Sequence, residues 1–207
     1  VIVEIKLGII KSHSAGKTIL YHLTKNMGIH AEKLKKIIAV KESGKQFITD
    51  THRLIVDRKS LFITNKENEN EQHLLFTEIP KQFCFNQYKI QCSLVPIQEL
   101  NIKTSPRYAY FDADKIEFPL LLRKAKEGDY FYPFGMSKSK TPGKVGKKKL
   151  SKYFKDEKFS LLDKEHAAVL FSGEKLIWLI NHRTDDRFKV TPSTKRVLKM
   201  VVVDSDN

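Results

Sequence analysis

The chain has 207 residues, of which 41% are hydrophobic and 10% aromatic, so it can build one large or two small cores and is not intrinsically disordered. Its 38 Lys and Arg against 24 Asp and Glu give a net charge of +14, which favours a nucleic acid or an acidic surface as partner. No apolar run reaches the roughly 18 residues of a membrane span, so we expect a soluble, cytoplasmic protein with no membrane partner and no secretion signal. Because the chain begins at Val1 and not at methionine, we also expect a fragment of a longer protein.

The N-terminal residues predict a helix pair followed by strands. Apolar side chains recur at helical spacing from Ile19 to Ala39, and Gly28 is a natural stop between two helices. From Lys45 to Thr64 the period changes to that of strands, with a polar turn at residues 57–60.

The segment Ser14-Ala15-Gly16-Lys17-Thr18 has the end of a nucleotide-binding P-loop pattern. The full pattern requires a glycine five residues before Gly16, and that position is Lys11. We therefore interpret Ser14 or Thr18 as a helix cap. A phosphate-handling enzyme built on Lys17 and Thr18 remains the least favoured alternative, and ATP turnover by the isolated chain would support it.

The middle of the chain predicts a linker and then a strand. Residues 65–73 contain no apolar side chain and are typical of a solvated loop. Apolar residues alternate from Tyr88 to Val95, which predicts a strand with one buried face. Cys84 and Cys92 lie in this region without zinc-ligand spacing, so we expect buried free thiols in a reducing compartment.

From Pro106 onwards the pattern predicts strands with a few segregated helices. The expected strands are 120–122, 167–171, 175–181 and 197–203, and the expected helix is 147–154. Such an order is typical of an α+β fold with a mixed sheet. The resulting division is a helical connector at 1–41, a β-rich linking region at 42–105 and a C-terminal α+β domain at 106–207.

No residue pattern predicts catalysis or a metal site. Asp112-Ala113-Asp114 resembles the start of a calcium loop, but Ile116 and Glu117 occupy positions that require an oxygen ligand and a glycine, which favours a simple turn. The seven histidines are scattered and form no recognisable triad.

Basic residues concentrate between Arg123 and Lys158, where twelve Lys and Arg stand against four Asp and Glu. On the predicted helix, Leu150, Tyr153 and Phe154 share one stripe, and the opposite stripe carries Lys148, Lys152 and Lys155. The loop before the helix extends this basic surface with Lys138, Lys140, Lys144 and Lys147. We predict that these lysines contact phosphates, while the alternative is a solvated helix surface.

A second charged cluster follows the apolar strand that ends near Ile180. Arg183, Asp185, Asp186 and Arg187 can form ion pairs that hold a loop in shape, or can present an arginine to a phosphate or base. Both interpretations stand, and Arg183 is the freer arginine because two aspartates directly precede Arg187.

Five motifs in this order resemble the C-terminal part of the tRNA(Ile)-lysidine synthetase family. They are F-P-L-L-L-R at 118–123, G-D-Y-F-Y-P-F-G-M at 128–136, K-K-L-S-K-Y-F at 148–154, I-W-L-I-N-H-R-T-D-D-R-F-K-V-T at 177–191, and T-K at 194–195. Two features depart from the family pattern: the loop 137–146 is longer than expected, and Asn181 stands where a glycine is expected. The helix pair and first hairpin resemble, less sharply, the region that joins the family's catalytic domain to its C-terminal domain.

The resemblance implies a function. In that family an N-terminal domain uses ATP and magnesium to adenylate the wobble cytidine of tRNA(Ile), and lysine then displaces AMP. The C-terminal parts hold and select the tRNA, with a fold related to a domain of the phenylalanyl-tRNA synthetase β subunit. The family's S-G-G-x-D-S nucleotide loop is absent from this sequence, so we expect a non-catalytic, cofactor-free fragment with tRNA(Ile) as its partner. A free-standing basic RNA-binding protein is the alternative, and a homodimer is possible in either case.

Overall fold

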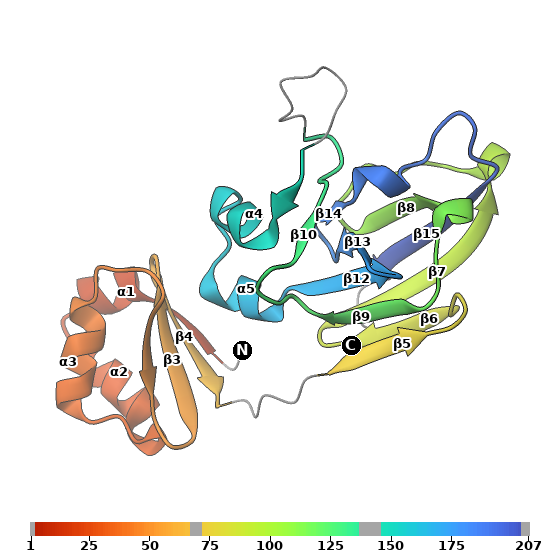
Figure 1. Ribbon diagram of the computed structural model, residues 1–207. Helices are drawn as coiled ribbons and strands as arrows, with labels where there is room; N and C mark the ends of the chain where they lie inside the picture. The colour runs from red at the N-terminus through yellow and green to blue at the C-terminus, as the bar shows by residue number, and fades with distance from the viewer. Residues whose placement is uncertain (1–2, 67–71, 137–145, 204–207) are drawn as a thin grey trace. The chain divides into compact units, whose positions relative to one another are not determined.

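A computed structural model of the chain describes residues 3–66, 72–136 and 146–203. The structure consists of two compact units, Val1–Asn70 and Glu71–Asn207 (Figure 1). The predicted boundaries at 41/42 and 105/106 do not coincide with this division. The first predicted region and part of the second fold together in unit 1, and the remainder of the second belongs to unit 2.

Unit 1 is a two-layer α+β structure, with its helices on one face of an antiparallel sheet (Figure 1). The sheet has the strand order β1-β4-β3-β2. In chain order the elements are β1 (Val3–Lys6), α1 (Leu7–Ser12), α2 (Gly16–Thr24), a 3₁₀ turn η1 (Lys25–Met27), α3 (Ala31–Ala39), β2 (Lys45–Ile48), β3 (His52–Asp57) and β4 (Ser60–Asn65).

The unit 1 core explains why the helix pair and the strands form one unit. Leu20 of α2 and Ile37 of α3 are fully buried together with Leu54 and Leu61 of the sheet. Burying such side chains contributes about 1.5–3 kcal/mol each, and neither layer can do this alone. The predicted helix stop is confirmed, because Gly28 adopts the left-handed conformation, with φ of 72°.

The glycine of the P-loop-like segment has a packing role. A Cβ atom on Gly16 would lie 1.9 Å from the carbonyl oxygen of Ile10, so only glycine lets α2 start this close to α1. The predicted cap is wrong: the N-cap of α2 is Ala15, and neither Ser14 nor Thr18 caps it. The start of α2 and its close approach to α1 account for the residues of this segment, and a bound phosphate is not needed to explain them.

Unit 2 contains a five-stranded sheet of order β14-β13-β12-β9-β5, a four-stranded sheet of order β6-β7-β15-β8 and the small pair β10-β11, all antiparallel. The elements up to β9 are β5 (His73–Phe76), β6 (Gln82–Phe85), β7 (Tyr88–Pro96), η2 (Ile97–Glu99), β8 (Tyr108–Asp112), η3 (Ala113–Lys115) and β9 (Leu120–Lys124). They are followed by β10 (Tyr130–Phe131), β11 (Lys148–Lys149), α4 (Leu150–Asp156), α5 (Leu161–His166), β12 (Ala168–Ser172), β13 (Lys175–Leu179), β14 (Arg183–Thr184), η4 (Asp186–Phe188) and β15 (Arg196–Val203). The predicted α+β class is confirmed.

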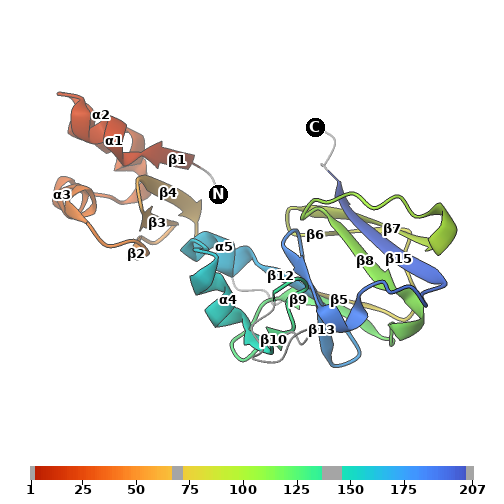
Figure 2. The ribbon, with the colours of Figure 1, turned by 90° about the horizontal axis from the view of Figure 1, so that it is seen from above.

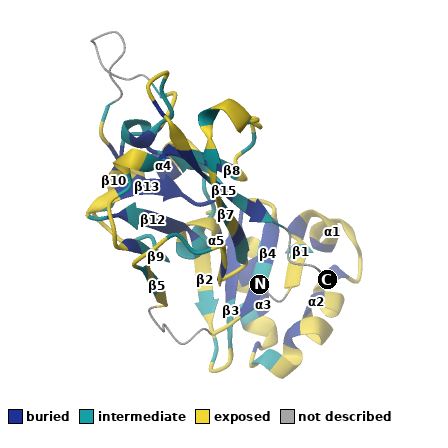
Figure 3. Cartoon of the chain, turned by 90° about the vertical axis from the view of Figure 1, so that its right-hand side faces the viewer, coloured by how far each residue is buried: buried dark blue, intermediate teal, exposed yellow. Residues whose placement is uncertain are grey.

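The two larger sheets of unit 2 pack face to face (Figure 2). Leu170 and Trp178 from one sheet share a core with Phe111 and Met200 from the other. Because neighbouring strand residues point to opposite faces, Val169 and Leu179 lie on the other side of the five-stranded sheet. There they pack against β10 and α4 in a separate core. The central strands β12 and β13 are therefore buried on both faces (Figure 3).

Three local predictions need correction. The helix begins at Leu150 and not at Lys147, because residues 148–149 pair with β10 as a strand. Cys84 is exposed and Cys92 half-buried, so only the second approaches the predicted buried thiol. Burial raises the pKa of the Cys92 thiol to about 12. The predicted buried face of β7 also fails at Leu94, which is 49% exposed.

Candidate nucleic-acid interface

The aromatic segment Tyr130–Phe134 lies between the lysine segment and the Arg/Asp cluster. On one side Tyr130 and Phe131 pair with residues 149 and 148 of β11. On the other side Pro133 forms a β-bridge with Asp185, and the Phe134 N–H donates to the carbonyl of Thr184 at 2.9 Å. The structure thus joins two clusters that are about 35 residues apart in sequence into one surface of unit 2.

Asp185 fixes the Arg/Asp side of this surface. Its carboxylate is fully buried and accepts hydrogen bonds from the Tyr132 N–H at 2.8 Å and from the Arg187 N–H at 2.9 Å. The Arg187 guanidinium adds two bonds, from Nε at 2.8 Å and Nη2 at 2.9 Å. Burial lowers the pKa of Arg187, but the hydrogen bonds and charge of Asp185 outweigh it and the pKa is raised. This half of the cluster is a structural ion pair.

Arg183 has a different environment. It is half-buried, its Nη1 donates to the carbonyl of Phe134 at 3.0 Å, and its buried Nε has no hydrogen-bond partner among the described atoms. The residue that turns the chain towards it, Asn181, adopts the left-handed conformation with φ of 59°. Asparagine tolerates this conformation better than most residues, so it serves where the family resemblance leads one to expect glycine.

Lys148 does not belong to a basic helix face. Its side chain is only 7% exposed and forms an ion pair with Asp156 at 2.9 Å. The ammonium also lies 5.2 Å from the centre of the Tyr153 ring. The prediction that Lys148 points outward with Lys152 and Lys155 is wrong, because Lys148 lies on the inward face of a strand.

The other predicted lysines divide into two groups. Lys147, Lys152 and Lys155 are exposed and form no ion pair with any acidic residue in the part of the chain that the structure describes. Lys138, Lys140 and Lys144 lie outside the described residues. Sequence reasoning missed Lys149, which is also exposed. Strand alternation across residues 147–149 was the pattern that could have identified it.

The aromatic anchors of α4 are as predicted. Leu150, Tyr153 and Phe154 are at most 7% exposed and pack in the core beneath the five-stranded sheet. Phe131 meets the Tyr153 ring edge-on, with centroids 5.3 Å apart. These contacts hold the β10–β11–α4 segment on the sheet.

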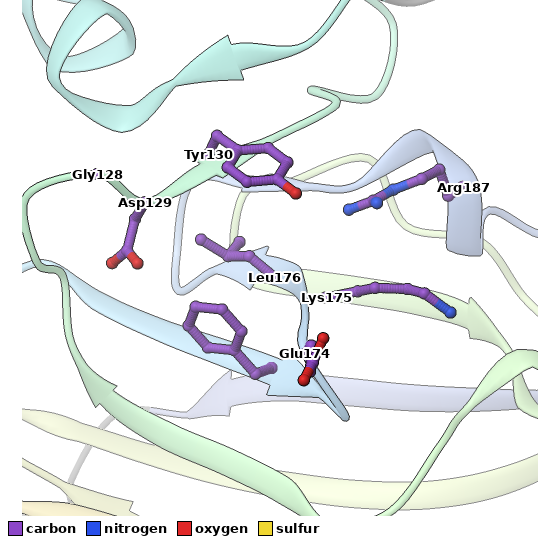
Figure 4. Close-up of a pocket in the computed structure, with 8 residues that line it drawn as sticks. Gly128, Asp129, Tyr130, Glu174, Lys175, Leu176 and Arg187 are labelled. Carbon is purple, nitrogen blue, oxygen red and sulfur yellow. The ribbon is translucent and has the colours of Figure 1, made fainter.

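A pocket opens beside Tyr130 (Figure 4). Tyr130, Phe171 and Leu176 provide apolar lining. The lining cations Lys175 and Arg187 are each ion-paired, with Glu117 at 2.7 Å and with Asp185 at 2.8 Å. Figure 4 shows the Arg187 side chain extending towards the Tyr130 ring. Asp129, also in the lining, is already engaged in a bidentate ion pair with Arg123 at 2.7 and 2.8 Å.

Charge is segregated along the chain. Residues 1–66 carry thirteen Lys and Arg against five Asp and Glu, and residues 123–158 carry twelve against four. The remainder carries thirteen against fifteen and is slightly negative. The net positive charge therefore comes from two segments, one in each unit, and the first was not singled out from the sequence.

Other site types find no support within the described ranges. No group of three His, Cys, Asp or Glu side chains there could hold a metal ion. The Asp112 carboxylate accepts from the Asp114 N–H at 3.3 Å and from Thr194 Oγ1 at 2.9 Å, as expected for a turn. No described helix has the length and apolar character needed to cross a membrane.

Comparisons with known proteins agree with these observations. Residues 2–67 match the family model described as the TilS substrate binding domain, a single match that crosses the predicted boundary at 41/42. A tRNA(Ile)-lysidine synthase of Parabacteroides distasonis is 40% identical over 200 residues, covering 94% of this chain and 43% of that protein. The chain belongs to the tRNA(Ile)-lysidine synthase family. It matches the C-terminal part of these proteins.

Two further similarities support this assignment. The tRNA(Ile)-lysidine synthase of Bacteroides thetaiotaomicron is 32% identical over 201 residues, covering 96% of this chain and 43% of that protein. A crystal structure of a TilS C-terminal domain superimposes with a TM-score of 0.53 at 14% identity, covering 66% of this chain and all of that one, which establishes the shared fold. The chain thus spans less than half the length of the two related synthases.

Proposed function

We propose that this chain is the tRNA-holding part of a tRNA(Ile)-lysidine synthase. In the parent enzyme, lysine is ligated to the wobble cytidine of tRNA(Ile) at the expense of ATP. We place ATP, Mg²⁺ and the chemistry outside this chain, because it lacks the family's S-G-G-x-D-S loop. Its own contribution is binding and selection of the tRNA.

The observation that carries this proposal is the exposed basic surface formed by Lys147, β11 and α4. Lys147, Lys149, Lys152 and Lys155 are exposed, and none pairs with an acidic residue among those described. A surface that needs charge only for solubility ordinarily mixes both signs. Cations without a partner in the protein are available to neutralise RNA phosphates.

Unit 1 supports the same proposal from a second direction. Its match to a substrate binding domain and its thirteen basic against seven acidic residues support a second phosphate-binding surface. We therefore extend the proposed tRNA contact to both units.

A charge-reversal experiment tests the surface on α4. The double variant K152E/K155E should bind a tRNA(Ile) transcript more weakly and with a shallower salt dependence, because each lost phosphate contact removes about 0.7 to 0.9 from the logarithmic slope. The control K81E/K195E reverses two lysines that are also exposed, elsewhere in unit 2. Equal losses in both variants would mean that only net charge matters and that α4 is not the contact.

A second measurement concerns chemistry. The purified chain, incubated with ATP, lysine and unmodified tRNA(Ile), should form neither AMP nor lysidine above background. Product formation would contradict the proposed division between a catalytic part and this binding part.

A further inference from the structure

The segment Tyr130–Phe134 exposes aromatic rings at alternate positions. Phe131 and Pro133 point inward and are buried, whereas Tyr130 is 40% exposed, Tyr132 is half-buried and Phe134 is 47% exposed. Large aromatic side chains are usually buried in a core or an interface, so exposed and half-buried rings at alternate positions of an ordered segment suggest a ligand surface.

Two of these rings have a cation over their face, and the third belongs to a residue whose backbone carbonyl binds an arginine. The Lys147 ammonium lies 3.5 Å from the centre of the Tyr130 ring. The Arg187 guanidinium carbon lies 4.4 Å from the centre of the Tyr132 ring. Arg183 is hydrogen-bonded to the carbonyl of Phe134. Rings and positive charges therefore alternate along this surface.

We propose that this surface binds unpaired nucleotides of an RNA, with a base stacked on Tyr130 in the adjoining pocket and the Lys147 ammonium at a neighbouring phosphate. This inference rests on the proposed function for the identity of the ligand, an RNA. It adds that the bound nucleotides are unpaired. A base offers a flat π-face that stacks on aromatic side chains, and Arg and Lys beside the ring bind the backbone. In a duplex the base faces are covered by neighbouring pairs, so rings add nothing to duplex binding.

The spacing of the rings fits stacked bases. Side chains at i and i+2 of an extended segment are about 6.6 Å apart. Two base-stacking distances of about 3.4 Å span nearly the same length. The pocket lining of Phe171 and Leu176 continues the apolar surface beyond Tyr130, and Lys175 and Arg187 border it. Glu174 at the rim has an exposed carboxylate that can accept a hydrogen bond from a base amino group.

The test compares two RNA probes with the complete chain. One is a single-stranded 12-nucleotide RNA containing 2-aminopurine, whose fluorescence falls on stacking, and the other is a 12-base-pair RNA duplex. Tyr130→Ala should weaken single-strand binding about 5- to 150-fold and abolish the fluorescence quench, because one stacked base contributes this much. Duplex binding and the salt dependence should stay unchanged, since no charge is removed.

Matched variants separate stacking from folding. Tyr130→Phe keeps the ring and should bind within about threefold of the wild type, and Leu75→Ala alters another residue that is 60% exposed in unit 2 and should have no effect. Equal weakening of duplex and single strand by Tyr130→Ala, or an unchanged quench, would overturn the inference while leaving the proposed function intact. A wild-type chain that binds neither probe nor tRNA would overturn both.

Discussion

Replacing Asp185 with asparagine should destabilise unit 2 although the side chain keeps its size. Each carboxylate oxygen accepts two hydrogen bonds: Oδ1 from the N–H and Nε of Arg187, and Oδ2 from Nη2 of Arg187 and the N–H of Tyr132. Asparagine has one oxygen and one NH₂ group, so in either orientation two donors face another donor. An unsatisfied buried donor costs about 1–3 kcal/mol.

Solvent reduces part of this cost, because the Arg187 side chain is 33% exposed and can bind water. We therefore expect a loss of about 2–4 kcal/mol in the free energy of unfolding, which corresponds to a decrease of about 5–15 °C in Tm. Urea titrations and thermal melts followed by circular dichroism measure both quantities.

The neighbouring carboxylate provides the control. Asp186 also pairs with a cation, Lys189 at 3.0 Å, but that ammonium side chain is 42% exposed. Such pairs contribute about 0–1 kcal/mol, so Asp186→Asn should be nearly neutral. If the two variants lose the same stability, the hydrogen-bond network of Asp185 does not organise this loop and our reasoning is refuted.

Three other perturbations test the packing. Gly16→Ala should destabilise unit 1 by about 1–3 kcal/mol or more, because the added Cβ overlaps the Ile10 carbonyl. An unchanged midpoint of urea unfolding would contradict the close approach of α2 to α1. Phe154→Ala should cost about 3–5 kcal/mol in unit 2, measured by thermal melts, and a loss below 1 kcal/mol would show that the ring is not a core residue. Burial lowers the pKa of His182, so the unfolded chain binds more protons than the folded chain, and the free energy of unfolding should decrease as pH falls below about 6.5. His182→Gln should flatten this pH dependence. Identical pH profiles of the free energy of unfolding in the variant and the wild type would exclude His182 as its source.

The fold class and most strands could be predicted because their residues follow simple periods. The hairpin β12–β13 is one example: two apolar runs flank Gly173, whose φ of 55° permits the tight turn. The division into units could not be predicted in this way. The residues around position 42 change from helical to strand period, but the buried side chains Leu20 and Leu54 on either side of that change pack in one core. Periodicity describes local structure, and the shared core is a tertiary property.

The error at Lys148 shows how one wrong period changes a predicted site. On a helix, residues 148, 152 and 155 lie on one face, whereas on a strand residue 148 points opposite to 147 and 149. Tyr130 and Phe131 pair with residues 148–149, and this tertiary pairing overrides the helical preference of the lysine run. Lys148 consequently turns inward to Asp156, and the outward positions pass to Lys147 and Lys149.

The same alternation of inward and outward side chains gives neighbouring residues of the surface different roles. Phe131, Lys148 and Asp185 are buried and hold three chain segments together through a ring contact, an ion pair and four hydrogen bonds. Next to them in sequence, Tyr130 and Lys147 point outward, and Lys147 has no acidic partner among the described residues. Because the buried set fixes the backbone, the outward groups lose little conformational entropy when a ligand binds. A cation that is paired within the protein would have to break that pair before it could bind an external anion. Lys147 has no such pair among the described residues, which favours contact with an external anion over a purely structural role.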